Sequence, residues 1–128
     1  MSRDKAARMA GLADVAGVIL EARLADLRAA NALREATQAR IAALERRTAP
    51  PTDPEMSPVS LARNDLLYDR WVESRRVDLN LRLARETAAW HEERARAATA
   101  LGRTDALRRL EDQLRADIAR KTARHRER

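Results

Sequence analysis

The chain has 128 residues, no cysteine, three aromatic residues and a formal net charge of +6. Disulfides and thiolate metal sites are therefore excluded, and there are too few large side chains for a closed globular core. Charged residues make up 36% of the chain and only three residues are glycine, which is typical of a long helix or a coiled coil. The longest apolar run without a charge is 15–20, so we expect no membrane insertion.

The first predicted element is a helix over about 3–47. Apolar residues recur there at steps of mostly three and four, as expected for one face of a helix: Met9, Leu12, Ala16, Ile19, Leu20, Leu24, Leu27, Ala30, Leu33, Ile41 and Leu44. The opening letters, MSRDKAARMAGLAD, contain no continuous apolar segment of the kind found in secretory signals. We therefore expect a cytoplasmic protein.

All four prolines lie between Pro50 and Pro58. A proline inside a helix costs about 3 kcal/mol, so no helix can continue through this segment. The sequence predicts a turn over 48–58, in which Ser57 caps the next helix and Pro58 takes its first position.

A second helix is predicted over about 59–126, because apolar residues again recur at helical spacing almost to the end of the chain. Gly102 is its one weak point, where the helix either breaks or continues. The predicted fold is all-α: residues 1–128 form a single coiled-coil domain, an antiparallel two-helix hairpin whose second helix is longer and overhangs the first.

A tight turn with Arg47 facing Pro58 predicts a register in which residue i lies near residue 105 − i. Trp90 would then lie opposite the small residues around Gly17, and Trp71 opposite Arg34. In this register everything beyond about Asp105 has no partner within the chain.

The predicted overhang combines an apolar stripe with basic residues, and we expect it to bind a partner. Its members are Leu107, Arg108, Arg109, Leu110, Leu114, Arg115, Ile118, Arg120, Lys121 and Arg124. A homodimer that hides the stripe, or a frayed tail, is the alternative explanation. A second candidate contact surface lies near the turn, at Tyr68, Trp71 and Val72, where packing between the helices is the alternative.

No residue pattern indicates catalysis. Neither His91 nor His125 has a glutamate three positions earlier, as di-iron helical bundles require, and glycine is too scarce for a phosphate-binding loop. We expect no enzyme activity and no cofactor. The basic C-terminal residues permit nucleic-acid binding, but acidic residues are interspersed with them.

A hairpin of two long helices, the second one longer, resembles the FliJ family of flagellar export stalk proteins and the related YscO proteins of type III secretion. The segment WHEERARAATALGRTDALRRLEDQL, residues 90–114, looks like their long C-terminal helix. The resemblance implies a non-enzymatic protein at the cytoplasmic periphery of the export apparatus. It would insert its basic end into a hexameric export ATPase and couple the ring to an export gate protein. The alternative is a coiled-coil adaptor or nucleoid-associated protein that binds nucleic acid through that end.

Overall fold

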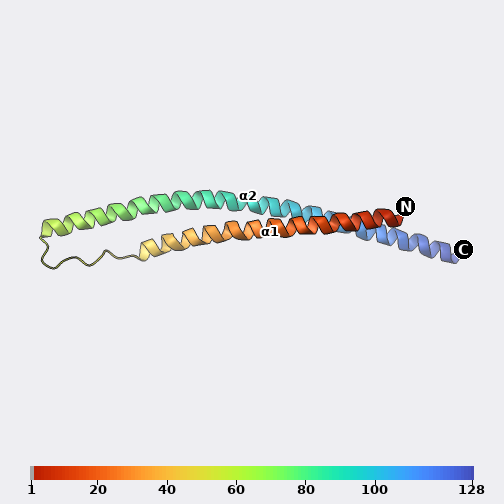
Figure 1. The fold of residues 1–128 in the computed structure, drawn as a ribbon, viewed down its shortest axis with the longest axis horizontal. Coiled ribbons are helices and arrows are strands. Elements are labelled where there is room, and N and C mark those ends of the chain that lie inside the picture. The colour runs from red at the N-terminus through yellow and green to blue at the C-terminus, as the bar shows by residue number, and fades with distance from the viewer. Residues whose placement is uncertain (1) are drawn as a thin grey trace. The chain divides into compact units, whose positions relative to one another are not determined.

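The computed structural model describes residues 2–128, in which two helices, α1 (Ser2–Arg46) and α2 (Pro58–Glu127), pack against each other (Figure 1). The part of the chain that it describes contains no strand. The expected all-α helical hairpin with a longer second helix is confirmed. Each helix boundary lies one residue from its predicted position.

The start of α2 shows the predicted cap. The Ser57 side-chain oxygen accepts a hydrogen bond from the backbone N–H of Ser60 at 3.2 Å, and the Ser57 carbonyl accepts from the N–H of Leu61 at 3.0 Å. Pro58 is the first residue of the helix, where its missing N–H costs nothing. The serine and the proline together define where α2 begins.

Gly102 does not interrupt α2, which is continuous from Pro58 to Glu127. Two residues later, the buried Thr104 donates its hydroxyl to the carbonyl of Ala100 at 2.9 Å. This bond within the helix lets Thr104 be buried without leaving a polar group unsatisfied.

The chain divides into two compact units. The first, which we call the terminal unit, combines residues 2–29 of α1 with residues 91–128. The second, the loop unit, comprises residues 30–90 and contains the end of α1, the connecting loop and the first part of α2.

The seam of the terminal unit, meaning the side chains with which its two helical segments face each other, is built mainly from small residues. Ala13 of α1 and Ala97, Ala100 and Thr104 of α2 are buried. On α2 the covered positions continue at steps of four and three to Leu107, Glu111, Leu114 and Ile118, which are half-buried. Alternating steps of three and four are the heptad spacing of a coiled coil.

The seam of the loop unit has larger and more polar members. Leu44 and Leu79 are buried, and Thr37 is only 1% exposed. The Thr37 hydroxyl donates a hydrogen bond to the Glu86 carboxylate on the other helix. One turn away, the Arg34 guanidinium lies 4.1 Å from the centroid of the Trp90 ring, a cation–π contact.

The predicted register is wrong. Thr37 and Glu86 have residue numbers that add to 123, and those of Arg34 and Trp90 add to 124, instead of the expected 105. Trp90 therefore lies against Arg34 and not opposite Gly17. In the terminal unit, the Arg108 guanidinium is the neighbour of Gly17.

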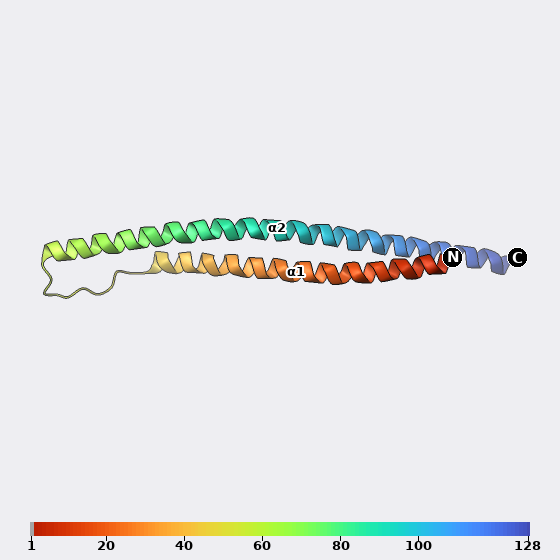
Figure 2. The ribbon, with the colours of Figure 1, turned by 45° about the horizontal axis from the view of Figure 1, so that its top comes forward.

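The path of the loop explains the error. Residues 47–57 do not make a tight turn but run along α2 before entering it (Figures 1 and 2). The Arg47 guanidinium lies 4.6 Å from the centroid of the Trp71 ring, and the Asn64 amide donates to the Met56 sulfur at 3.4 Å. Extended chain advances about 3.1 Å per residue against 1.5 Å in a helix. A proline-rich loop segment is therefore about as long as a helical segment with twice as many residues. This extra length shifts the register.

Candidate functional site

The predicted overhang is paired within the terminal unit. Leu110 and Leu114 line a groove of about 380 Å³ together with Met9 and Leu12 of α1. Lys5, Arg8, Gln113 and Asp117 form the rest of its lining. We call this the terminal groove. The expectation that Leu110 and Leu114 have no partner within the chain is wrong, because the register places α1 beside them.

Some residues of the predicted overhang lie in the seam between the helices, and the others lie on the surface. Leu107, Leu114 and Ile118 are half-buried, whereas Leu110 is 46% exposed. Arg115 pairs with Glu111 and Arg120 with Asp117, each at 2.6 Å within α2. The remaining basic members, Arg108, Arg109, Lys121 and Arg124, are exposed. Their contact with a partner stays a prediction.

A true overhang exists but is much shorter than predicted. In the observed register α1 continues beside α2 as far as the terminal groove, which Lys5 and Asp117 both line, and the end of α2 extends past α1 (Figure 2). This end contains Arg124, His125 and Arg126, all exposed. It carries charge and no apolar stripe.

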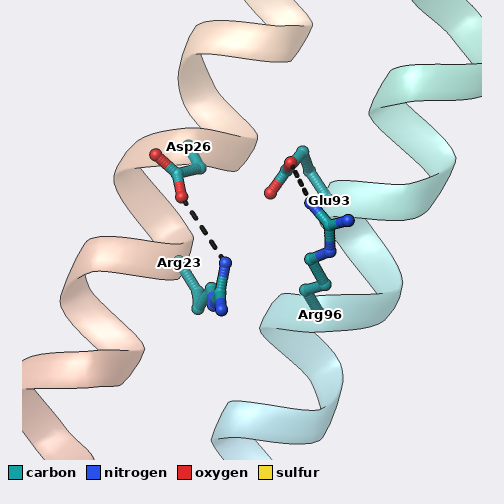
Figure 3. Close-up of polar contacts among 4 residues, drawn as sticks. All are labelled: Arg23, Asp26, Glu93 and Arg96. Atoms are coloured by element: carbon teal, nitrogen blue, oxygen red, sulfur yellow. Dashed lines mark hydrogen bonds and ion pairs between the residues drawn. The ribbon is translucent and has the colours of Figure 1, made fainter.

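A cluster of charged side chains lies on the terminal unit where α1 and α2 face each other (Figure 3). Arg23 and Asp26 form an ion pair at 3.9 Å on α1, and Arg96 and Glu93 form one at 2.8 Å on α2. Both pairs join residues on the same helix. Because their side chains are partly exposed, such pairs contribute at most about 1 kcal/mol each to the stability of the fold.

The second candidate site lies in the loop unit, where α1 ends. A groove of about 530 Å³ is lined by three arginines, Arg40, Arg47 and Arg75, together with Trp71. Its remaining lining is apolar and comes from Ala43, Leu44 and Leu79. We call this the arginine–tryptophan groove. Leu44 and Leu79 are buried in the seam, so the apolar side of the groove belongs to the packing between the helices.

The residues predicted near the turn have different environments. Tyr68 and Val72 are half-buried, and Trp71 is 44% exposed. The Tyr68 and Trp71 rings lie 6.2 Å apart, centroid to centroid, at a tilt of 32°. Trp71 does not face Arg34 as predicted. It faces Arg47, the first residue after α1.

Sequence reasoning missed the arginines of this groove. Arg40 and Arg47 lie seven residues apart, which is two helical turns, so both lie on the same side of the end of α1. That spacing was a usable signal. Their meeting with Arg75 depends on the register and on the path of the loop, which the sequence pattern did not reveal.

Neither groove contains a recognisable catalytic arrangement. Within residues 2–128, no group of three or more histidine, aspartate or glutamate side chains is placed to hold a metal ion. No described helix is long and apolar enough to cross a membrane. Both grooves combine apolar side chains with basic ones, Lys5 and Arg8 in the terminal groove and three arginines in the arginine–tryptophan groove.

Comparisons with protein-family models, curated proteins and solved structures found no match to this chain.

Proposed function

We propose that this protein is a non-enzymatic helical-hairpin stalk that acts by binding another protein through its terminal unit. The observation that carries the proposal is the exposed apolar surface of that unit. Leu12 and Leu110, which line the terminal groove from α1 and α2, remain 54% and 46% exposed. Apolar side chains grouped on a helical surface are a common mark of a protein-binding site.

The resemblance to FliJ-type stalks supplies the identity of the partner in this proposal. The partner is a hexameric export ATPase in the cytoplasm, and the terminal unit enters its ring. The corrected register changes how the insertion works: the inserted surface combines side chains of both helices, Leu12 from α1 and Leu110 from α2, with Lys5 and Arg8 beside them. Coupling to an export gate protein would use a different part of the chain.

A binding experiment with matched variants tests this proposal. The purified chain is mixed with a purified hexameric export ATPase, and co-elution and ATP hydrolysis are measured. Leu110→Asp should abolish co-elution, because it places a charge where an apolar surface must be buried. Leu81→Asp is the control, since Leu81 is 52% exposed but belongs to the loop unit. Equal binding by both variants would contradict the proposal.

The exposed basic end of α2 keeps nucleic-acid binding as the second candidate function. Replacing Lys121, Arg124 and Arg126 with Gln separates the two. Under the stalk proposal this change slows association with the ATPase and makes it less sensitive to salt. Loss of retention on double-stranded DNA at physiological salt, with no effect on the ATPase, would favour the adaptor instead.

A further inference from the structure

The arginines of the arginine–tryptophan groove lack acidic partners. Among the described residues, ion pairs join carboxylates to arginines such as Arg23, Arg82 and Arg96, but Arg40, Arg47 and Arg75 form none. The contrast is local, because the neighbouring Arg76 binds Glu73 at 2.8 Å. Three guanidinium groups thus line one groove without a carboxylate to neutralise them.

The groove is also arranged to hold an apolar group. Leu44 and Leu79 are 7% and 3% exposed, so the wall to which they belong is part of a packed seam. Trp71 offers a half-exposed ring, and the Arg47 guanidinium lies 4.6 Å from its centroid. Tryptophan and arginine are the side chains that most often supply binding energy at protein interfaces.

We propose that the arginine–tryptophan groove binds an acidic segment of a partner protein that carries an apolar side chain. Carboxylates of the segment would pair with Arg40, Arg47 and Arg75, since the planar guanidinium matches a carboxylate in two parallel hydrogen bonds. The apolar side chain would lie between Trp71 and the Leu44–Leu79 wall. This site belongs to the loop unit and does not depend on the function proposed for the terminal unit.

The charge pattern around the groove favours an acidic peptide over nucleic acid. Glu45 lies between Arg40 and Arg47 in the sequence, and Glu73 and Asp78 flank Arg75. A phosphate backbone is long and uniformly charged and is bound by surfaces with a denser run of basic residues. One groove with an apolar wall fits a short acidic segment with one anchoring side chain.

The test uses a short fluorescein-labelled peptide in which glutamates surround a central leucine, with fluorescence anisotropy as the readout. The full chain should bind it, and Arg40→Gln/Arg47→Gln/Arg75→Gln should weaken binding at least about tenfold, since each charge-assisted pair is lost. Arg63→Gln is the matched control, an exposed arginine of α2 outside the groove, and it should leave the affinity unchanged. Glutamine is as good a helix former as arginine, and circular dichroism checks that the triple variant keeps its helices.

Two further comparisons test the apolar contact and the preference for a peptide over nucleic acid. A peptide with serine in place of the central leucine, and the single variant Trp71→Ala, should each bind several-fold more weakly, because they remove the apolar contact. A single-stranded oligothymidine of similar charge should bind more weakly than the peptide. Equal loss with Arg63→Gln and the triple variant, no effect of the leucine, or tighter binding of the oligothymidine would each overturn the proposal.

Discussion

The two units pair their helices with different side chains. The terminal unit buries Ala13, Ala97 and Ala100. Such small side chains let two helical backbones approach closely, but sliding one helix along the other would bring one alanine into the place of another. The loop unit buries Leu44 and Leu79 and places a hydrogen bond and a cation–π contact across its seam. Directional contacts are satisfied in one alignment only, whereas small residues tolerate several. We infer that the loop unit determines the register.

The largest expected effect comes from the apolar part of the loop-unit seam. Leu79→Ala should lower the free energy of unfolding by about 2–5 kcal/mol, because it leaves a cavity next to Leu44. Leu81→Ala, two residues away and 52% exposed, should cost less than about 0.5 kcal/mol beyond its small change in helix propensity. Urea titrations of both variants give the comparison, and similar losses would show that Leu79 is not part of a packed seam.

The terminal unit should respond most to added volume. Ala100→Leu should destabilise the protein by about 1–3 kcal/mol, because the enlarged side chain separates helices that the small residue lets approach. Ala98→Leu adds the same volume at an exposed position of α2 and should be close to neutral. The same urea titrations measure both. A neutral Ala100→Leu would mean that the terminal seam is not tightly packed.

The polar contact of the loop unit should behave as a coupled pair. Thr37→Val keeps the side-chain shape and removes the donor to Glu86, which should cost about 1–2 kcal/mol. Glu86→Leu in the Thr37→Val background should recover much of that loss, since both members of this hydrogen bond are then gone and Arg82, which also pairs with Glu86, is exposed enough to be solvated. A double-mutant cycle on the free energy of unfolding measures the coupling. Simple additivity would indicate that the two groups do not interact.

The smallest effect concerns the start of α2. Ser57→Ala removes the acceptor for the Ser60 N–H and should cost about 1 kcal/mol. Ser57→Gly should cost only a few tenths of a kcal/mol, because glycine is also tolerated at this position. Thermal melts followed by circular dichroism distinguish the two. A larger loss with glycine than with alanine would contradict the capping role.

The helices, their ends and the cap at Ser57 could be predicted from the sequence, because heptad spacing and prolines act locally. The register could not be, because it depends on how far the loop travels, and two prolines in succession permit an extended path as readily as a turn. A signal was present nevertheless. Arg34 and Thr37 interrupt the apolar spacing of α1, and Glu86 interrupts that of α2. Matching these polar positions to each other gives the observed pairing.

The contrast between local signals and the register also explains which residues of the candidate sites could be predicted. Trp71 could be singled out as an anchor because exposed aromatics near a loop are conspicuous in a sequence. The three arginines around it come from α1, the loop and α2 and meet only when the register is known. Leu110 and Leu114 were recognised as an apolar stripe, but their neighbours Met9 and Leu12 were assigned elsewhere by the wrong register.

The pairing of Thr37 with Glu86 defines how the two helices of the loop unit are aligned, and trapping it as a disulfide tests that alignment. The native chain has no cysteine, so introduced pairs report without background. Thr37→Cys/Glu86→Cys, oxidised mildly at low concentration, should form an intramolecular disulfide that mass spectrometry of the digested protein identifies. Thr37→Cys/Tyr68→Cys, the pair expected for a tight turn, should remain reduced under the same conditions. Efficient trapping of the second pair and not the first would contradict the register.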